Sequence, residues 1–278
     1  MPFNIALHIS SKEKLYKFIS LAIGVLAYVF IISLYLLILN FTPATEEGLK
    51  IKNAVNGFTF LVFVYIGLAI IIAMISVRII KAKMFGNYVL VNEQQFPHIY
   101  EIVKDSSKRL GLKTVPEVFI YNSQGIMNAF AMRLTGSKKY ICLTSAIIDA
   151  DNDKQIRFVI GHELGHHVAG HLNTWFRILA FPNLFIPFLP FALSRAREIT
   201  CDRIGHYVAD DIHDSASALQ MLACGSAKLN HLMNHEAFHQ QEKMVSPLWG
   251  FYHELFLTHP RLTLRVAELK KWAQRNPN

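Results

Sequence analysis

The chain has 278 residues, of which 52% are hydrophobic and only 17% are charged, and its formal net charge at pH 7 is +8. Soluble domains carry about a quarter charged residues, so this composition argues against an ordinary soluble domain. The three cysteines indicate no disulfide framework and fit a reducing compartment. No dense basic run lies beside an aromatic platform, so we expect no nucleic-acid partner.

Two uncharged stretches near the N-terminus predict membrane-spanning helices. Residues 18–39 form a run of 22 residues without a charge, and residues 58–77 form another of 20. Each is long enough, as a helix, to cross a hydrocarbon core of about 30 Å. A buried core helix or a signal peptide is the alternative, but two runs in succession without a small-residue cleavage motif favour two spans. We therefore predict a membrane anchor over residues 1–83.

Basic residues flank these stretches on the sides away from the connecting loop. They are Lys12, Lys14 and Lys17 before the first stretch and Arg78, Lys81 and Lys83 after the second. Because positive residues remain on the cytoplasmic side, we expect both termini and the following domain to be cytoplasmic. After residue 77 the chain has 23 Lys and Arg against 17 Asp and Glu, an excess that favours contact with an anionic leaflet of the lipid bilayer.

The remaining residues, 84–278, have the pattern of one α+β domain. Apolar spacing predicts a helix over residues 93–110. Stretches rich in β-branched and aromatic residues predict short strands at 115–121 and 140–144, with a third apolar segment between them at 128–132. A small sheet packed beside helices follows from this order of elements.

A metal-binding pattern lies in the next predicted helix. His162 and His166 are four residues apart, so both imidazoles project from one helix face and can hold one Zn²⁺ at neighbouring corners of a tetrahedron. Glu163 lies beside them, where a carboxylate can take a proton from a water on the zinc. The pattern is typical of zinc peptidases. The alternative is two core histidines satisfied by hydrogen bonds, which leaves Glu163 unexplained.

A second apolar region, residues 174–193, follows this helix. Its uncharged part, residues 178–193, has 16 residues and is interrupted by Pro182, Pro187 and Pro190. Proline kinks or breaks helices, and the run is too short for two spans. We predict a loop or short hairpin that enters the cytoplasmic leaflet. A hydrophobic loop that covers the domain core is the alternative.

Two carboxylates further along the chain complete the candidate site. Glu198 and Asp202 are four residues apart, so on a helix they share one face. We predict that Glu198 is the third zinc ligand and that Asp202 orients a zinc-bound histidine. A solvated helix with Arg–Glu pairs is the alternative. His171 lies one residue short of the third histidine of another zinc motif, so we assign it to the helix end or to the support of a ligand.

Two further short patterns accompany these residues. They are Asn128-Ala129-Phe130-Ala131 and His259-Pro260 followed by Arg265. In order and spacing, the four patterns between residues 128 and 265 resemble those of the membrane zinc metallopeptidases of the HtpX and CAAX-protease family. The chain departs from that family at Cys201, where alanine is usual, and at residues 174–193, where two further membrane helices are usual.

The resemblance implies a zincin-like, mainly helical peptidase domain with a small sheet, preceded by the two transmembrane helices. It implies a gluzincin-type endopeptidase with one Zn²⁺ per chain, in which His162, His166 and Glu198 hold the zinc and Glu163 is the general base. It also implies a bacterial inner-membrane location. The expected substrates are proteins or peptides, in particular misfolded membrane proteins.

The resemblance also gives roles to the two short patterns. Residues 128–131 would form a sheet edge beside the zinc that binds substrate as an added strand, with an ordinary strand as the alternative. His259 would stabilise the oxyanion of the transition state, supported by Arg265. The alternative is that His259 and Pro260 only begin the C-terminal helix.

Two other classes of function compete with a peptidase. One is a non-catalytic membrane scaffold or regulator stabilised by a closed structural zinc site, against which the intact Glu163 argues. The other is a lipid-binding or nucleic-acid-binding membrane protein with incidental histidines. The zinc content of the purified protein separates this second class from both zinc-binding interpretations.

Overall fold

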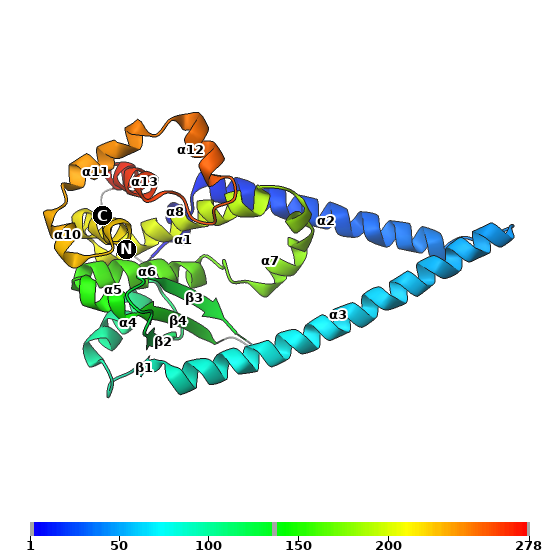
Figure 1. Ribbon diagram of the computed structural model, residues 1–278, viewed down its shortest axis with the longest axis horizontal. Helices are drawn as coiled ribbons and strands as arrows, with labels where there is room; N and C mark the ends of the chain where they lie inside the picture. Colours follow the sequence, from blue (N-terminus) through cyan, green and yellow to red (C-terminus); the bar gives the residue numbers. More distant parts are fainter. Residues whose placement is uncertain (1–2, 135–137, 277–278) are drawn as a thin grey trace.

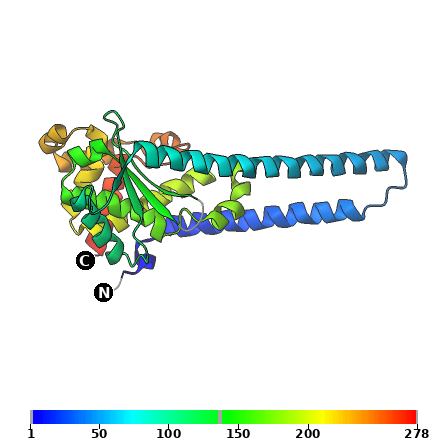
Figure 2. The same cartoon turned by 90° about the horizontal axis from the view of Figure 1, so that it is seen from below.

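The computed structural model describes residues 3–134 and 138–276 of the chain. Two long helices, α2 (Ser11–Asn40) and α3 (Glu46–Asn87), project together from a head formed by the rest of the chain (Figures 1 and 2). The short helix α1 (Ile5–His8) precedes α2 and contacts the head. The division into a membrane anchor at residues 1–83 and a peptidase domain at residues 84–278 stays a prediction.

Helices α2 and α3 confirm the two predicted apolar helices. The Ser10 and Thr45 side chains cap the N-termini of these helices. Each accepts a hydrogen bond from a backbone N–H group of the first turn, where a helix leaves the N–H groups without intrahelical partners. Both helices are long and apolar enough to cross a membrane, and only 6% and 0% of the residues in their most apolar windows are buried. A core helix of a soluble protein would bury its apolar residues, so this exposure distinguishes both helices from core helices.

The sheet of the head has four strands in the spatial order β1-β2-β4-β3. The strands are β1 (Val89–Val91), β2 (Glu117–Tyr121), β3 (Ala129–Arg133) and β4 (Lys139–Thr144). The two central strands pair in parallel, and each edge strand pairs antiparallel with its neighbour. Strands β2, β3 and β4 match the three predicted strands within a few residues. The sequence analysis missed β1, which is only three residues long.

Helix α4 (Pro97–Arg109) begins four residues later than the sequence predicts. The Asn92 side chain accepts hydrogen bonds from the backbone N–H groups of Gln94 and Gln95, and this turn replaces the predicted first helical turn. Gly111, just beyond the helix, has a φ of +67°, which glycine adopts without steric cost.

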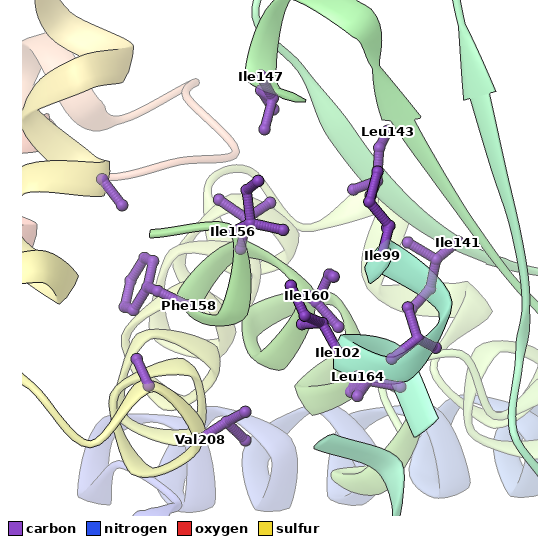
Figure 3. Close-up of a cluster of buried hydrophobic side chains, with 14 of the residues drawn as sticks. Ile99, Ile102, Ile141, Leu143, Ile147, Ile156, Phe158, Ile160, Leu164 and Val208 are labelled. Carbon is purple, nitrogen blue, oxygen red and sulfur yellow. The ribbon is translucent and has the colours of Figure 1, made fainter. Parts of the chain in front are cut away.

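The other helices surround a central one, α6, whose side chains are buried on most of its surface. In chain order they are α5 (Ser145–Ala150), α6 (Asp153–Val168), α7 (Thr174–Leu179), α8 (Leu189–Ala209), α9 (Ile212–Cys224), α10 (Ala227–Leu232), α11 (His235–Gln241), α12 (Pro247–Glu254) and α13 (Leu262–Arg275), with 3₁₀ turns η1 (Phe181–Phe185) and η2 (Glu242–Met244). Figure 3 shows Ile156, Ile160 and Leu164 of α6 in the same apolar cluster as Ile141 of β4 and Val208 of α8. Helix α6 is therefore held between the sheet and α8.

Helix α6 crosses α8 at close range because glycine faces glycine. A Cβ atom on Gly161 would lie 3.0 Å from the Cα atom of Gly205 and 2.9 Å from the Val208 side chain. A Cβ atom on Gly205 would lie 2.7 Å from the carbonyl oxygen of Phe158. Larger side chains here would push the two helices apart. The close crossing brings the histidines of α6 within reach of the carboxylates of α8.

The apolar region at residues 174–193 packs against α2. The Asn183 side chain donates a hydrogen bond to the carbonyl oxygen of Ser20 at 3.0 Å, and the Tyr28 hydroxyl donates to the carbonyl oxygen of Ile178 at 2.7 Å. The acceptor, the carbonyl oxygen of Ser20, and the donor, the hydroxyl of Tyr28, both lie on α2 within the predicted span. These contacts place the region against the first predicted span. They do not favour the alternative prediction, in which the region is a loop that covers the domain core.

The outer side of this region is apolar and exposed. Trp175 is 75% exposed, Leu184 65% and Phe185 80%, in a segment that contains α7, the 3₁₀ turn η1 and the beginning of α8. The region is too short and too broken to form the two further spans of the resembling family, as the sequence predicts. Its entry into the leaflet remains a proposal.

Candidate active site

Helix α6 presents both histidines to one carboxylate of α8. The Nε2 atom of His162 lies 3.5 Å from Oε2 of Glu198, and the Nε2 atom of His166 lies 3.5 Å from Oε1 of the same residue. His162 is 7% exposed and Glu198 3%. Two imidazole nitrogens and a carboxylate that converge in this way are a donor set that suits Zn²⁺.

Hydrogen bonds on the far side of His162 fix which ring nitrogen faces Glu198. Its Nδ1 atom lies 2.9 Å from Oδ1 of Asp202, so Nδ1 carries the proton and donates it to the carboxylate. Arg265 donates two hydrogen bonds to Asp202, at 2.8 and 2.6 Å. Burial opposes ionisation of Asp202, but the charge and hydrogen bonds of Arg265 hold its pKa below the usual range. Burial lowers the pKa of His162, but its hydrogen bonds to Asp202 and Glu198 raise it overall to about 10, so a metal at Nε2 would displace the proton that this nitrogen otherwise carries.

A second chain of hydrogen bonds supports His166. Its Nδ1 atom lies 3.1 Å from Nδ1 of His171, and Nε2 of His171 lies 2.9 Å from Oε1 of Glu13. Burial lowers the pKa of His171 to about 4, so its ring is neutral and donates through Nε2 to Glu13. Nδ1 of His171 is then an acceptor, and His166 must donate through its own Nδ1. The Nε2 lone pair of His166 consequently faces Glu198.

Glu13 is the functional residue that the sequence analysis missed. It lies in the first turn of α2, is 1% exposed, and also accepts a hydrogen bond from the Thr200 hydroxyl. The backbone N–H of Ser10 donates to the same hydroxyl oxygen at 3.0 Å. A lone acid among Lys12, Lys14 and Lys17 was the available signal, because an acid in a basic membrane flank is unusual.

Cys201 forms a second metal-compatible group with the two histidines. One ligand atom from each of His162, His166 and Cys201 lies within 4.8 Å of the others. The Cys201 side chain is fully buried, and this burial raises the pKa of its thiol well above the usual value. Binding of a metal to this cysteine would require loss of the thiol proton. Glu198 contacts the Nε2 atoms of both histidines at 3.5 Å, and this geometry favours Glu198 over Cys201.

A cavity of about 730 Å³ opens beside these residues. Its wall contains His162, Glu163, His166, Glu198, His259 and Arg265 together with residues 128–131. Glu163, at 5% exposure, reaches the cavity from the same helix as the two histidines. Every residue that the sequence predicts for the site lies on this cavity, except Asp202, which lies behind His162.

Strand β3 contributes the edge of the sheet to this cavity. It pairs only with β4 among the strands of residues 3–134 and 138–276, so its other edge is unpaired. The segment before it is anchored, because Asn128 and Thr144 exchange hydrogen bonds of 3.1 and 3.0 Å. An open strand edge beside the histidines is the arrangement that an added substrate strand needs.

His259 and Arg265 take different positions at the site. The Nδ1 atom of His259 lies 2.8 Å from Oε2 of Glu198, and its side chain is 65% exposed toward the cavity. Arg265 is 6% exposed and directs its guanidinium at Asp202. The geometry therefore favours a positioning role for Arg265 and direct access to the cavity for His259.

The site has a glutamate next to two histidines on one helix, and a carboxylate on a neighbouring helix is the candidate third ligand. Together with a cleft that has an open strand edge, these features define the HExxH class of metal centre. The model of peptidase family M48 matches residues 93–186 and 175–273 of the chain. This match covers more than half of the sequence, so the chain belongs to peptidase family M48. The family resemblance and the mainly helical fold class that the sequence predicts are thereby confirmed.

Several relatives support this assignment. Plastoglobule-localized metallopeptidase 48 of Arabidopsis thaliana is 26% identical over 219 residues, which are 71% of this chain and 63% of the relative. A protease HtpX homolog of Thermodesulfovibrio yellowstonii is 25% identical over 260 residues, which are 79% of this chain and 90% of the relative. The crystal structure of S. mikatae Ste24p has a similar fold, with a TM-score of 0.51 and 17% identity, over 91% of this chain and 66% of that one. The chain thus spans just under two thirds of the chloroplast relative and of Ste24p.

Proposed function

We propose that this protein is a membrane-anchored zinc endopeptidase. The observation that carries the proposal is the convergence of His162, His166 and Glu198 at the wall of a cavity that also contains Glu163. One Zn²⁺ per chain would be held by the two Nε2 atoms and the Glu198 carboxylate. Zinc would supply Lewis acidity at this position, which polarises the scissile carbonyl.

Glu163 would carry the proton in this mechanism. Its carboxylate lies in the same cavity wall as the ligands, where it takes a proton from the attacking water and delivers it to the leaving amine. His259 would stabilise the oxyanion in its doubly protonated form, in which Nδ1 donates to Glu198 and Nε2 donates to the oxyanion as it forms. The edge of β3 would hold the substrate backbone as an added strand.

Four residues would position the ligands without touching substrate. Asp202 and Arg265 orient His162, and His171 and Glu13 orient His166. Partners of this kind fix the tautomer and orientation of a metal-binding histidine.

Residues 1–83 would anchor the protein in the bacterial inner membrane, with residues 84–278 in the cytoplasm and the apolar region at 174–193 in the cytoplasmic leaflet. The exposed apolar helices and the basic flanks support this arrangement. Misfolded membrane proteins are the expected substrates. A cysteine introduced at Glu46 should be labelled from outside the cell and one at Asn278 should not; the reverse pattern contradicts the topology.

The direct test of the activity is casein cleavage by the detergent-purified, zinc-loaded protein. We expect a chelator to abolish cleavage and Glu163→Gln to lower it by at least about 10²-fold while zinc is retained. Glu101→Gln, at an exposed position of α4, is the matched control and should cleave normally. If Glu163→Gln keeps near-normal turnover, the mechanism is wrong. If the wild type binds zinc but cleaves nothing, the non-catalytic scaffold is the better interpretation.

A further inference from the structure

Two cationic side chains lie over the Phe176 ring at the base of the long helices, and a third cationic residue follows Phe176 in the chain. The Lys17 Nζ atom lies 5.8 Å from the centre of the ring, and the Arg197 guanidinium carbon lies 5.0 Å from it. Arg177 follows Phe176 directly in α7. Burial lowers the pKa of Arg197, Glu13 opposes this effect, and the positive charge of Arg177 adds to it. The cluster is therefore a concentration of like charge.

These cations form no ion pair and no side-chain hydrogen bond within residues 3–134 and 138–276. The negative charge of Glu13 acts on Arg197 from beyond ion-pair distance. Arg197 is half-buried, and its Nε atom is buried and has no hydrogen-bond partner among these residues. A guanidinium nitrogen that is withdrawn from water without a hydrogen bond costs free energy that an anion would offset.

The cluster opens into a cavity of about 830 Å³ that is separate from the peptidase cleft. Arg177 and Arg197 line one part of it, and Tyr28 of α2, Ile66 of α3 and Leu184 line another. Figures 1 and 2 show α7 lying between α2 and α3 where these two helices diverge. The cavity thus has a charged part near the head and an apolar part between the long helices.

The position of the cluster matches the phosphate level of a bilayer. Lys17 is the last residue before the apolar stretch of α2, so the cluster lies where the predicted span meets its basic flank. Basic pockets between membrane helices on the cytoplasmic side bind anionic lipid headgroups. A second buried atom in the cavity wall, Oδ1 of Asn183, has no partner among the described residues and would accept a hydrogen bond from a headgroup hydroxyl.

We propose that this cavity binds one anionic phospholipid, with its phosphate at Arg177 and Arg197, an acyl chain along Tyr28 and Ile66, and the charge of Lys17 nearby at Phe176. The proposal rests on the membrane insertion of the proposed function but not on its chemistry. The bound lipid would join α7 to both long helices, because its two ends contact different elements.

The test uses the full-length, delipidated protein carrying Glu163→Gln, so that binding is measured without proteolysis. Native mass spectrometry in detergent would count the retained lipids during titration with phosphatidylglycerol, with zwitterionic phosphatidylethanolamine or with inorganic phosphate. We expect one tightly held phosphatidylglycerol per chain and at least tenfold weaker binding of phosphatidylethanolamine. Equal binding of the two lipids would overturn the proposal. Tight binding of inorganic phosphate alone would show an anion site and not a lipid site.

Variants locate the binding. Arg177→Gln changes an exposed side chain without a partner and should weaken phosphatidylglycerol binding by about tenfold, which is the size expected for one hydrogen bond to a charged group. Arg197→Gln should weaken it further, and Arg197→Lys should restore part of the loss. Arg78→Gln is the matched control, because Arg78 is an exposed basic residue at the corresponding end of the second apolar stretch and does not line the cavity.

If Arg78→Gln and Arg177→Gln weaken binding equally, general attraction to the leaflet explains the result and the site is refuted. Should Arg197→Gln fail to fold, Arg177→Gln alone decides. Failure of the wild-type protein to float with liposomes would instead refute the membrane insertion, whereas loss of casein cleavage would have no bearing on the lipid site.

Discussion

The two candidate zinc-binding histidines are oriented from different parts of the molecule. His162 is oriented by Asp202 and Arg265, which lie on α8 and α13 of the head. His166 is oriented by His171 and then by Glu13, which lies on α2, the helix that continues into the first apolar stretch. One half of the site is therefore built within the head, and the other half needs the first turn of α2. This difference predicts that mutations on the two sides have unequal effects.

The largest effect is expected on the side of the head. Asp202→Ala would remove both hydrogen bonds of the buried Arg265 guanidinium and leave it with the longer ion pair to Glu198 at 3.6 Å, which costs about 3–5 kcal/mol of stability, and would remove the hydrogen bond that orients His162. Zinc affinity should fall by about 10- to 100-fold. Thermal unfolding and competitive zinc titration measure these changes. Asp105→Ala, which breaks an exposed ion pair with Arg157, should cost less than about 1 kcal/mol, and equal losses in the two variants would contradict the account.

His259 contacts Glu198, the proposed third ligand on α8, and tests the stabilisation of the oxyanion. His259→Ala should retain zinc and fold but lower kcat by about 10²-fold with little change in KM, because an oxyanion donor acts only in the transition state. His253→Ala, at an exposed position of α12, serves as the control. An unchanged kcat with a lower melting temperature would show that His259 is structural.

Mutation of Glu13, on α2, should have a smaller effect on zinc affinity. Glu13→Gln keeps the shape of the side chain but removes the carboxylate that fixes the His171 ring, and zinc affinity should fall by about tenfold. Glu46→Gln, an exposed acid at the other end of the long helices, should bind zinc normally. His171→Ala and Glu13→Gln should be non-additive, since they act through one chain of hydrogen bonds. Additive losses would show that Glu13 acts on stability and not through His171.

The smallest effect is expected at Cys201. Cys201→Ala should leave the zinc content and casein cleavage near wild type, because Glu198 contacts both imidazole Nε2 atoms and would provide the third ligand. Glu198→Ala is the contrasting variant and should lose the metal. If the Cys201 variant loses zinc and the Glu198 variant keeps it, the assignment of the third ligand is reversed.

Local sequence signals predicted the elements that local physics determines. Runs of 20 or more uncharged residues could only form long apolar helices, and residues four apart on α6 and α8 had to share a helix face. Strand β1 escaped prediction because three residues show no periodicity, and it exists through pairing with β2. The start of α4 was predicted too early because the Asn92 turn competes with the helix.

The candidate site shows the same limit. His162, Glu163 and His166 form a pattern within five residues, but Glu13 and His171 are separated by 158 positions and meet only when α2 packs against α8. No periodicity connects such residues. The packing of residues 174–193 against Ser20, Gly24 and Tyr28 is likewise a tertiary contact that composition does not reveal.

X-ray absorption at the zinc edge of the purified, zinc-loaded protein tests the central claim most directly. The account predicts one zinc per chain, surrounded by nitrogen and oxygen atoms at about 2.0–2.2 Å and by no sulfur. The spectrum of the Cys201→Ala protein should be the same as that of the wild type. A sulfur atom at about 2.3 Å in the wild type, absent in Cys201→Ala, would contradict the ligand set of His162, His166 and Glu198.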